Sequence, residues 1–491
     1  MRLSELISGR SMMPALFGKS DPEIVGITAD SREVRPGWLF AALPGSRLDG
    51  RAFIRQAIDN GASAILTTPD ARAEVDEQVG LIADGEPRQW LAKMAATFYR
   101  TQPDTVVAVT GTNGKTSVAE FTRQIWAQAD YRSASLGTLG LTVNGKVEGP
   151  SLTTPDPVSL HALMKDLATR EISHAAIEAS SHGLDQSRLD GLHLKAAAFT
   201  NLSRDHLDYH GTMEAYLTAK MGLFDRVMAP GGTAVLNGDA DEFQALAGVA
   251  GRRKHRIISF GQMRGAELRI ATRTPAPSGQ VVDIIALGRA RTLNLPLVGA
   301  FQAWNAMAAL GLAIGGGMRV GRALECLAKI KGVRGRMEKV ATLVNGAAVY
   351  VDYAHTPDAL QTVLTSIRPH VQGNLWCVFG CGGDRDAGKR PLMGAVVDRL
   401  ADKAVITDDN PRSEDPASIR EAAAAACPDA LNIGDRAKAI QVAMEQLGAG
   451  DVLVIAGKGH EPGQEINGEI LPFDDASVAR GFDLQAGGAT S

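Results

Sequence analysis

The sequence predicts an α/β protein of three domains whose sheets are mainly parallel. A chain of 491 residues is longer than one hydrophobic core usually serves, and domains of about 100–200 residues suggest three of them. Short apolar runs alternate with longer helical patterns along the chain, which is typical of α/β architecture. Most of these runs are continuously apolar, as a parallel strand buried on both faces requires.

The expected strands follow from these apolar runs. They lie at residues 64–67, 106–109, 175–177, 196–200, 232–236, 347–351, 375–379, 403–407 and 452–456. Residues 258–298 differ from these continuous apolar runs, because they contain short β segments separated by Gly and Pro. We expect them to form a small antiparallel sheet attached to the middle domain. A boundary is expected near Thr101, just before a strand, and a second near 331–336, where glycines follow a helical stretch. The expected domains are residues 1–101, 102–334 and 335–491.

Composition and charge exclude several classes of protein. Hydrophobic residues make up 45% and charged residues 22%, which is ordinary for a globular chain and argues against disordered and fibrous classes. A net charge of −4 argues against nucleic-acid and polybasic membrane partners. The N-terminus lacks the apolar stretch of a signal peptide, and no segment has the apolar length to cross a bilayer. We therefore expect a soluble, cytoplasmic protein. A monomer is a separate expectation that does not follow from these observations.

The cysteine pattern leaves two alternatives. The chain has four cysteines, Cys326, Cys377, Cys381 and Cys427, which are too few for a disulfide scaffold in a chain of this length. Cys377 and Cys381 could form half of a metal site, but no second Cys/His pair lies nearby at ligand spacing. Free thiols in a reducing compartment are the favoured interpretation.

A glycine-rich turn follows the expected strand at 106–109 and precedes a helical pattern from Ser117. Its pattern is Gly111-x-x-Gly114-Lys115-Thr116, shorter than the usual G-x-x-x-x-G-K-[ST], whose first glycine would fall at Val109. Glycines allow backbone N–H groups to face phosphate oxygens, and the helix N-terminus adds its dipole. The alternative is an ordinary junction with a chance Gly-Lys-Thr. The flanking strand and helix favour phosphate binding, with Lys115 at the β/γ-phosphates and the Thr116 hydroxyl on Mg²⁺.

The segment from Thr110 to Thr116 resembles the ATP loop of the Mur ligase superfamily, which also contains the folylpolyglutamate synthases. The resemblance implies a central P-loop-type, parallel-sheet ATPase domain and a Rossmann-like C-terminal domain. It also implies which residues bind ATP in this turn: Gly111, Thr112, Asn113, Gly114, Lys115, Thr116 and Ser117.

A carboxylate and a histidine follow two further strands. Glu178 ends the run at 175–177, where a parallel sheet could hold it beside the phosphate loop, although a lone Glu after a strand is more often a solvated loop residue. Residues 201–210 are dense in His and Asp, which favours a functional loop over a core. In the family, Glu178 and His206 match magnesium ligands, and Lys220 matches a carbamylated lysine. The implied catalytic residues are Lys115, Lys220 and His206, and the implied metal ligands are Thr116, Glu178, His206 and carbamylated Lys220. Without the resemblance, Lys220 would be read as an exposed helix lysine.

Two polar segments point to a nucleotide-sugar substrate. Residues 28–50 resemble the N-terminal UDP-binding domain of later-acting Mur ligases, with Ser31 and Arg32 at its D-S-R motif. Residues 151–157 form a hydroxyl-rich loop, for which sugar or phosphate contact and a plain helix cap weigh about equally from the residues alone. By the family pattern, UDP-N-acetylmuramoyl-dipeptide (UDP-MurNAc-dipeptide) contacts Ser31, Arg32, Thr153, Thr154, Ser180, Gln186 and Arg188.

The nucleotide is also expected to meet residues around the second domain boundary. Arg336 and His355 match family residues that lie against ATP, while Asp358, close by, could equally be a structural helix cap. Upstream, residues 299–305 resemble the family's G-x-F-N-x-x-N motif. Gln302 stands where the motif has its first Asn, so Asn305 is the better candidate for ATP binding.

Three loops at three expected strand ends could meet over one site for the incoming amino acid. They are residues 379–390, 409–412 and 457–461. Arg412 offers a fork for a carboxylate, and Glu461 offers an anion for a distal ammonium group. A plain turn is the alternative for 409–412. Asp-Asn-Pro-Arg resembles the motif of diaminopimelate-adding ligases, and the family pattern implies contacts to diaminopimelate from Arg385, Asp409, Asn410, Pro411, Arg412, Gly457 and Glu461.

Together these features predict a ligase that uses ATP and Mg²⁺ to add meso-diaminopimelate to UDP-MurNAc-L-Ala-D-Glu through an acyl phosphate, in peptidoglycan synthesis. Arg412 argues against a lysine-adding ligase, because lysine lacks the second carboxylate. The long N-terminal domain argues against a folylpolyglutamate synthase. A nucleotide switch that only hydrolyses ATP would not need the set of Arg385, Arg412 and Glu461.

Overall fold

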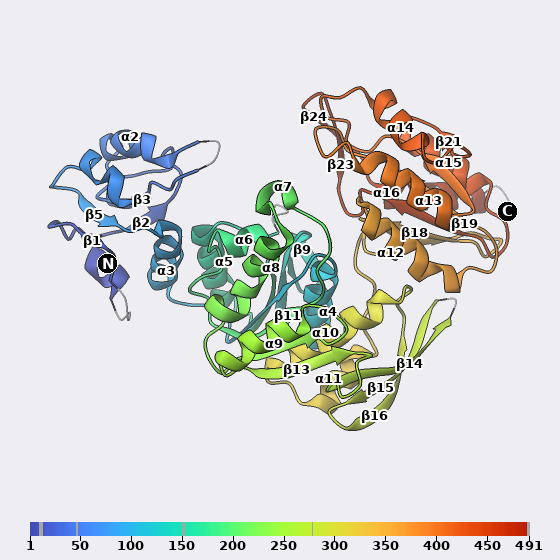
Figure 1. Cartoon of the computed structure of the whole chain (residues 1–491), viewed down its shortest axis with the longest axis horizontal. Coiled ribbons are helices and arrows are strands. Elements are labelled where there is room, and N and C mark those ends of the chain that lie inside the picture. The colour runs from blue at the N-terminus through green and yellow to red at the C-terminus, as the bar shows by residue number, and fades with distance from the viewer. Residues whose placement is uncertain (9–12, 46–47, 150–152, 277, 489–491) are drawn as a thin grey trace.

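The computed structural model shows three lobes that follow one another along the chain (Figure 1). It describes residues 1–8, 13–45, 48–149, 153–276 and 278–488. The predicted hydroxyl-rich loop at 151–157 therefore begins outside the described residues, because Ser151 is not among them. Each lobe has its own main sheet. The three separate sheets support domain boundaries near residues 101 and 334, which stay predictions.

The N-terminal lobe contains a five-stranded sheet in the order β1-β5-β4-β3-β2, parallel except for β1. Its strands are β1 (Leu16–Phe17), β2 (Gly26–Thr28), β3 (Trp38–Ala41), β4 (Ala64–Thr67) and β5 (Gly80–Ala83). Its α-helices are α1 (Leu3–Ile7), α2 (Ile54–Asp59) and α3 (Pro87–Tyr99). Leu39 of β3 packs with Trp90 of α3, whereas Phe40 packs with Ala57 of α2. The two faces of one strand thus serve two cores.

The central lobe contains an eleven-stranded sheet in the order β16-β15-β14-β13-β12-β11-β6-β10-β7-β8-β9. The strands are β6 (Thr105–Thr110), β7 (Ser133–Gly137), β8 (Gly140–Val143), β9 (Lys146–Glu148), β10 (His174–Glu178), β11 (Leu194–Phe199), β12 (Thr233–Asn237), β13 (Arg256–Gly261), β14 (Leu268–Ala276), β15 (Gly279–Ala286) and β16 (Arg289–Leu295). The helices are α4 (Lys115–Ala127), α5 (Pro157–Thr169), α6 (Ser181–Asp185), α7 (Leu207–His210), α8 (Met213–Gly222), α9 (Phe243–Arg252), α10 (Phe301–Gly315) and α11 (Val320–Leu327).

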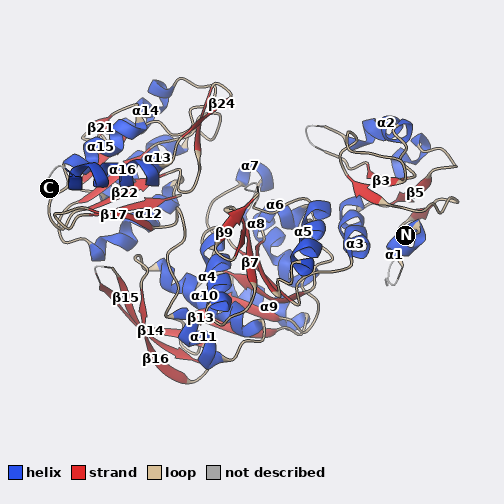
Figure 2. Ribbon diagram, turned by 180° about the vertical axis from the view of Figure 1, so that it is seen from behind, coloured by secondary structure: helices blue, strands red, loops and turns tan. Residues whose placement is uncertain are grey.

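Helices cover both faces of this sheet (Figure 2). Val107 and Val109 of β6 pack in the cluster that holds Phe121 of α4, while Val106 and Ala108 pack in the cluster that holds Leu160 of α5. This two-sided burial is the physical reason why the strand reads as an unbroken apolar run. The carboxyl ends of β6, β10 and β11 lie side by side, because these strands are parallel neighbours. Their loops therefore share one edge of the sheet.

The small antiparallel unit expected at 258–298 is present in β14, β15 and β16, but it is part of the main sheet of the central lobe, and β13 is parallel. β13 is a parallel strand that pairs with β12, and β14 to β16 continue the same sheet as an antiparallel extension. Apolar residues such as Leu268, Val282 and Ile284 alternate along these strands and join the core beneath α10. That shared core keeps the segment in the main sheet, so the central sheet is mixed rather than parallel throughout.

The C-terminal lobe contains a six-stranded sheet in the order β17-β18-β22-β19-β20-β21, parallel except for β17. The strands are β17 (Glu338–Thr342), β18 (Ala348–Asp352), β19 (Leu375–Phe379), β20 (Lys403–Ile406), β21 (Leu431–Asn432) and β22 (Val452–Ala456), with a hairpin of β23 (Gly463–Ile466) and β24 (Glu469–Pro472). The helices are α12 (Pro357–Ile367), α13 (Lys389–Leu400), α14 (Pro416–Ala424), α15 (Arg436–Glu445) and α16 (Asp475–Gly488).

All strands expected from apolar runs are present, and their ends differ from the expected positions by two residues at most. The predicted α/β class with three sheet-based lobes is confirmed. Within the described part of the chain, every helix is too short or too polar to span a bilayer.

The four cysteines are free and buried. Burial raises the pKa of each thiol, to about 12 at Cys381 and about 11 at Cys427. The Cys381 thiol lies 3.7 Å from the Met393 sulfur, and the described residues contain no cluster of three or more His, Cys, Asp or Glu side chains suited to a metal. The free-thiol interpretation therefore fits the structure better than a metal pair at Cys377 and Cys381.

Candidate active site

The glycine-rich turn joins β6 to α4 and leaves no room for side chains at two of its positions. A Cβ atom on Gly111, where φ is 149°, would lie 1.9 Å from Thr200 Oγ1. A Cβ atom on Gly114, where φ is 88°, would lie 2.4 Å from Asn305 Oδ1. Both glycines are therefore required by close packing as well as by backbone conformation. Asn201 holds the turn from the next strand, since its carbonyl and side-chain oxygens each accept a backbone N–H, from Thr112 and Asn113, at 2.9 Å.

Two lysines donate to one carbonyl oxygen of this turn. Lys115 Nζ lies 3.0 Å and Lys220 Nζ lies 2.8 Å from the Gly111 oxygen. Lys220 is only 1% exposed, and its Nζ lies 4.2 Å from the centre of the Tyr216 ring. Among the described acids, none forms an ion pair with Lys220. Burial first, and the charge of Lys115 second, hold the pKa of Lys220 well below its ordinary value, against a smaller opposing effect of Asp205. Lys220 is thus not the exposed helix lysine that its local sequence would suggest.

The pKa of Lys115 is also lowered, mainly by burial. Its Nζ donates to the Thr112 oxygen at 2.7 Å in addition to Gly111. Both lysines thus donate to backbone carbonyl oxygens of the turn. An anion placed over the turn would supply the missing negative charge.

Glu178 ends β10 and is only 1% exposed. Its Oε1 accepts the Thr138 N–H at 2.8 Å, and its Oε2 accepts the Thr138 hydroxyl at 3.2 Å. A Cβ atom on Gly137 would lie 1.9 Å from Glu178 Oε1, so this neighbour must be glycine. No described basic side chain pairs with Glu178. A buried carboxylate with no ion pair is costly unless a cation sits beside it, so this side chain fits a divalent-metal ligand.

His206 lies at a backbone position with φ of 53°, directly before α7. Its ring centre is 4.9 Å from that of His182, and its Nε2 is 3.5 Å from Asp205 Oδ2. Burial, the largest effect, lowers the pKa of His206, whereas Asp205 opposes the shift. A neutral imidazole is the form that can bind a metal. Of the predicted set, Thr116 and Lys220 lie at the turn and Glu178 ends the neighbouring strand β10, but the described residues do not form a cluster of three or more metal-binding side chains.

Thr153 and Thr154 connect this carboxylate to the predicted substrate residues. The Thr153 and Thr138 hydroxyls are 3.1 Å apart. Thr154 Oγ1 donates to the Glu178 backbone oxygen at 2.9 Å and accepts the Ser180 N–H at 3.1 Å. Arg188 donates to the Thr154 oxygen at 2.7 Å and to Gln186 Oε1 at 2.8 Å. The structure therefore brings together five of the predicted dipeptide-binding residues: Thr153, Thr154, Ser180, Gln186 and Arg188.

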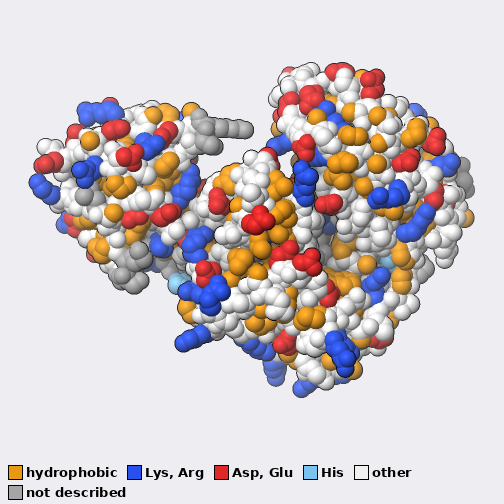
Figure 3. Space-filling view, viewed as in Figure 1, with side chains coloured by type: hydrophobic (Ala, Val, Ile, Leu, Met, Phe, Trp, Pro, Cys, Tyr) orange, Lys and Arg blue, Asp and Glu red, His pale blue; other side chains and the backbone are white. Residues whose placement is uncertain are grey.

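Ser31 and Arg32 stay apart from that network, in the N-terminal lobe. Arg32 is exposed and pairs with Asp30, and this pairing lowers the pKa of Asp30 to about 2. The Ser31 hydroxyl donates to Gln56 Oε1 at 3.4 Å. None of their hydrogen bonds in the described structure reaches the central lobe. The molecule is hollowed between the N-terminal and C-terminal lobes, above the central lobe (Figure 3).

The loops after β19, β20 and β22 converge in the C-terminal lobe, as expected for neighbouring parallel strands. Lys458, which is fully buried, places its Nζ 3.5 Å from Asp409 Oδ1, 3.0 Å from Asn410 Oδ1 and 3.4 Å from Glu461 Oε2. Asn410 Nδ2 in turn donates to Glu461 Oε2 at 3.0 Å. Gly457 has φ of 117°, and a Cβ atom there would lie 3.3 Å from Asp409 Oδ2. Asp409, Asn410, Gly457 and Glu461 therefore form one group around Lys458.

Arg412 and Arg385 flank Gly382. A Cβ atom on Gly382 would lie 3.1 Å from Arg412 Nη1 and 4.0 Å from Arg385 Cγ. Arg412 Nε pairs with Glu465 Oε2 at 3.1 Å, and its Nη1 donates to the Gly383 oxygen at 2.7 Å. Gly383 also packs closely against the Pro411 oxygen. Arg385 is exposed. Arg412 Nη1 and the side chain of Arg385 thus lie beside Gly382, where a carboxylate could enter.

Arg336 joins the C-terminal lobe to the glycine-rich turn. Its Nη2 donates to Thr116 Oγ1 at 3.2 Å, and its guanidinium lies 4.2 Å from the Tyr353 ring centre. Asn305, which packs on Gly114, donates to Gln302 Oε1 at 3.1 Å, and Gln302 Nε2 donates to the Arg336 oxygen at 3.4 Å.

His355 lies on the same side, with Nδ1 2.8 Å from the Tyr353 oxygen, and its pKa is lowered by burial. The predicted nucleotide residues Asn305, Arg336 and His355 are therefore all near the turn or attached to groups that contact it.

Comparisons with known proteins match all three lobes. Sequence profiles described as Mur ligase family, catalytic domain; Mur ligase middle domain; and Mur ligase, glutamate ligase domain match residues 23–99, 109–313 and 335–459, respectively. The chain belongs to the Mur ligase family. A UDP-N-acetylmuramoyl-L-alanyl-D-glutamate–2,6-diaminopimelate ligase of Caulobacter vibrioides is 50% identical over 93% of this chain and 95% of its own. The ligase of the same name from Agrobacterium fabrum is 49% identical over 93% of both chains.

Solved structures agree with this assignment to the Mur ligases. A structure of a UDP-N-acetylmuramoyl-L-alanyl-D-glutamate–2,6-diaminopimelate ligase is 35% identical, with a TM-score of 0.70 over 94% of this chain and 95% of that one. A folylpolyglutamate synthase of Mycobacterium tuberculosis shares the fold at 19% identity, with a TM-score of 0.63, and covers 81% of this chain.

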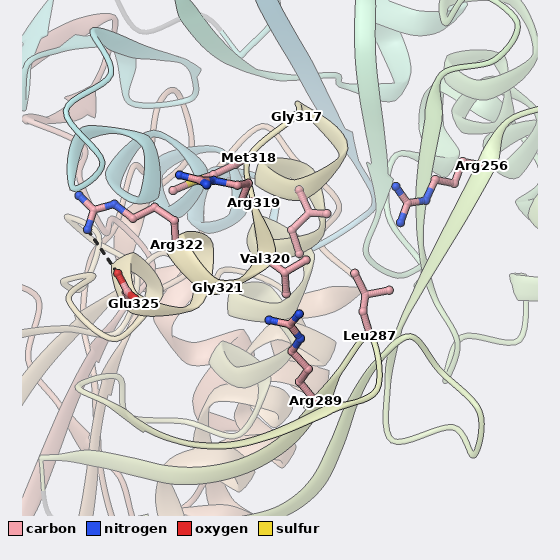
Figure 4. A pocket seen from close by; sticks show the side chains of 11 residues that line it. Arg256, Leu287, Arg289, Gly317, Met318, Arg319, Val320, Gly321, Arg322 and Glu325 are labelled. Carbon is pink, nitrogen blue, oxygen red and sulfur yellow. Dashed lines mark hydrogen bonds and ion pairs between the residues drawn. The ribbon is translucent and has the colours of Figure 1, made fainter.

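A cavity of about 890 Å³ in this Mur ligase lies away from the residues described above. Arg256, Arg289, Arg319, Arg322 and Glu325 are among its lining residues (Figure 4). None of the predicted site residues lines it. Arg256 and Arg289 begin β13 and β16, and β13 starts at the edge of the sheet opposite the glycine-rich turn. We therefore place the candidate active site in the loops at the carboxyl ends of the strands rather than in this cavity.

Sequence reasoning missed three residues of the site. Thr138 holds Glu178, Lys458 organises the amino-acid loops, and Gln302 links Asn305 to Arg336. A signal was present for two of them, because Thr138 lies in Gly137-Thr-Leu-Gly140 after a strand and Lys458 lies between Gly457 and Gly459. Gln302 was set aside because it departs from the family motif.

Proposed function

We propose that this Mur ligase uses ATP to join meso-diaminopimelate to UDP-MurNAc-L-Ala-D-Glu in peptidoglycan synthesis. The observation that carries the proposal is the meeting of three loops in the C-terminal lobe: Arg385 and Arg412 lie beside Gly382, and Asn410 donates to Glu461. Two guanidinium groups and a carboxylate match an amino acid that has a distal carboxylate and a distal ammonium group. The names of the relatives that cover nearly the whole chain support the same substrates.

The first step transfers the γ-phosphoryl group of ATP to the terminal carboxylate of the D-glutamyl residue. A carboxylate oxygen attacks the γ-phosphorus, the bond to the β-phosphate oxygen breaks, and ADP leaves an acyl phosphate behind. We assign the residues from Gly111 to Ser117 to the phosphates, with Lys115 neutralising charge. Asn305, Arg336 and His355 complete the nucleotide site. The hydrogen bond from Arg336 to Thr116 supports a role for the C-terminal lobe in this step.

Four residues would hold magnesium: Thr116, Glu178, His206 and Lys220. When bound there, Mg²⁺ would neutralise the phosphate oxygens during transfer. The buried, unpaired carboxylate of Glu178 fits this role. Lys220 as an ammonium ion does not, because its positive charge repels a metal ion. The lowered pKa of Lys220 favours the neutral amine, which can add to CO₂ and lose a proton to give an anionic carbamate.

The second step forms the amide bond. The amine nitrogen of diaminopimelate attacks the acyl carbon, the bond from carbon to the phosphate oxygen breaks, and the nitrogen loses a proton. We assign recognition of the amino acid to Arg385, Asp409, Asn410, Pro411, Arg412, Gly457 and Glu461. We assign the UDP-MurNAc-dipeptide to Ser31, Arg32, Thr153, Thr154, Ser180, Gln186 and Arg188. The network from Arg188 through Thr154 to Glu178 supports placing the acceptor carboxylate near the phosphates.

Phosphate release from ATP tests the function directly. The assay contains UDP-MurNAc-L-Ala-D-Glu with either meso-diaminopimelate or L-lysine, and mass spectrometry identifies the product. We expect release and a UDP-tripeptide only with diaminopimelate. Release with lysine would keep the ligase and refute the specificity assigned to Arg412. No substrate-dependent release would refute the ligase activity.

We further propose that the protein acts as a monomer in the cytoplasm, with no nucleic-acid or membrane partner. Four buried free thiols support a reducing compartment. Light scattering of the purified chain tests the monomer, and a mass near twice 51.8 kDa would refute it.

A further inference from the structure

The segment from Gly457 to Glu461, after β22, is held from two sides. On one side, Lys458 and Glu461 belong to the group that contains Asp409 and Asn410, which we assign to diaminopimelate. On the other side, His460 turns away from that group and reaches the central lobe. The segment therefore lies between the amino-acid site and the phosphoryl-transfer site.

His460 makes a direct contact between the two lobes. Its Nε2 lies 3.1 Å from the backbone oxygen of Thr138, a residue 322 positions earlier in the chain. The ring centre lies 5.3 Å from that of Tyr353. Space around the backbone of His460 is restricted, since a Cβ atom on Gly335 would lie 2.4 Å from the His460 nitrogen and one on Gly459 would lie 2.8 Å from Tyr353 Cβ. This packing limits the directions in which the imidazole can point.

Thr138, the acceptor of this contact, is the residue that holds Glu178. Its N–H and hydroxyl donate to the two oxygens of the Glu178 carboxylate at 2.8 and 3.2 Å. Gly137 packs so closely on that carboxylate that no Cβ atom fits between them. A displacement of the Thr138 backbone therefore changes the position of the carboxylate as well.

We infer that His460 is a positioning residue that couples the diaminopimelate loop to Glu178 through Thr138. The inference rests on the proposed function. Diaminopimelate that binds Glu461 and Asn410 orders the segment from Gly457 to Glu461, and the His460 contact transmits this order to the carboxylate that would hold magnesium. His460 itself touches neither the substrates nor the reacting atoms in this scheme. Coupling of this kind is reciprocal, so magnesium also favours binding of the amino acid.

Single-turnover formation of ADP measures the coupling, because the acyl phosphate forms before the amine attacks. ADP is measured by quenched flow over a range of Mg²⁺ concentrations, with UDP-MurNAc-L-Ala-D-Glu, in the presence and absence of saturating meso-diaminopimelate. For the wild type, we expect diaminopimelate to lower the Mg²⁺ concentration for half-maximal ADP formation by about fivefold or more.

Two variants test His460. His460→Phe keeps an aromatic ring but removes the donor, and we expect it to abolish the diaminopimelate-dependent shift in Mg²⁺ concentration. His460→Gln keeps an N–H donor at similar reach, and we expect it to retain the shift. His193→Gln, at an exposed histidine of the central lobe, serves as the matched control. If His460→Phe does not fold, His460→Ala provides the same measurement.

The outcomes separate the inference from the proposed function. A wild type that makes no UDP-tripeptide from diaminopimelate refutes the function. A wild type that makes the tripeptide but shows no shift refutes the coupling, and so does a His460→Phe variant that keeps the full shift. Loss of the shift in His460→Gln as well as in His460→Phe would also contradict the role given to the donor.

Discussion

The Gly111 carbonyl oxygen is an unusual point of the site because two lysines donate to it. Two ammonium groups this close repel each other, and no described carboxylate pairs with Lys220. Lys220 is therefore destabilising as an ammonium ion, and its low pKa is the expression of that cost. A residue kept at such a position despite the cost is expected to be needed for activity.

Lys220→Met should separate stability from activity. Methionine fills similar space without a charge, so we expect a rise of about 1–3 kcal/mol in the free energy of unfolding of the central lobe, measured in CO₂-free buffer. Turnover should fall at least about 100-fold, as expected when a charged group at a phosphoryl-transfer site is lost. Calorimetry and the phosphate-release assay give the two values. A variant that is less stable and fully active would contradict both the expected gain in stability and the expected loss of turnover.

The same substitution should change how stability depends on pH. Because the pKa of Lys220 is lower in the folded than in the unfolded chain, the unfolded state binds more protons between the two values. The contribution of unmodified Lys220 to stability therefore rises with pH from the lowered folded value up to about 10.4, the unfolded one. In Lys220→Met, we expect the free energy of unfolding, measured by urea titration, to lack this rise over the same pH range.

Arg412→Ala should weaken diaminopimelate specifically. Loss of a charged hydrogen bond costs about 1.5–3 kcal/mol, so kcat/KM for diaminopimelate should fall about 10- to 150-fold, while KM for ATP stays unchanged. The half-exposed pair with Glu465 contributes little stability, so the melting temperature should hardly move. Arg399→Ala on α13 is the matched control, because Arg399 donates to Gln361 and, among the described residues, forms no ion pair. Equally weakened use of ATP and diaminopimelate in the kinetic constants would contradict the assignment of Arg412 to diaminopimelate.

The site is built at the ends of strands, and a substitution at Gly137, where β7 ends, tests the importance of close packing there. Gly137→Ala forces Cβ toward Glu178 Oε1, so we expect a large loss of turnover and a higher Mg²⁺ requirement. Gly251→Ala on α9 has open space around its Cβ, and it should raise the free energy of unfolding by about 0.5–1 kcal/mol. Steady-state kinetics over Mg²⁺ concentration compare the two variants, and a normal Mg²⁺ requirement in Gly137→Ala would overturn the role of this close contact.

The long parallel strands were predictable from sequence because burial on both faces makes them continuously apolar. The edge strands were not. All three residues of β9 are exposed, and most of β16 is exposed as well, so no apolar run marks them. The antiparallel pairing within 258–298 was expected, but its membership of the main sheet was not, since a segment buried on one face gives no indication of which sheet it joins.

The site was predictable where its chemistry is local in sequence. The glycine-rich turn and the Asp-Asn-Pro-Arg loop are short motifs that carry their own signal. By contrast, Thr138 lies 40 residues from Glu178, and Lys458 lies 49 residues from Asp409. Such contacts depend on strand order, which the sequence pattern does not specify, and so the roles of Thr138 and Lys458 emerge only from the fold.

At the scale of the whole molecule, each lobe has its own hydrophobic core, with Val298 and Phe301 of the central lobe packed into the core of the C-terminal lobe. Few hydrogen bonds join the lobes. The C-terminal lobe meets the central lobe through Arg336, His460 and His370, whose Nδ1 lies 2.8 Å from the Ala276 oxygen. The N-terminal lobe meets the central lobe where α3 packs against α5 and where Val158 of α5 contacts the N-terminal core. Connections this sparse allow the lobes to unfold separately.

Calorimetry with and without ADP should show whether the lobes unfold independently. At ADP concentrations about 100-fold above its dissociation constant, binding stabilises the lobe that holds it by about 2.7 kcal/mol. We expect the transition of the central lobe to move up by roughly 5–10 °C while that of the N-terminal lobe stays in place. A single transition that shifts as a whole would show that the lobes unfold together.

The burial of all four thiols has a practical consequence for spectroscopy. Each native cysteine is shielded and has a raised pKa, so it reacts slowly with maleimides in the folded protein. A cysteine introduced at exposed Ala73 of the N-terminal lobe and another at exposed Lys438 of the C-terminal lobe would then be the fast-reacting positions without removal of any native thiol. A donor and acceptor dye attached there would report the distance between the outer lobes in single molecules during turnover.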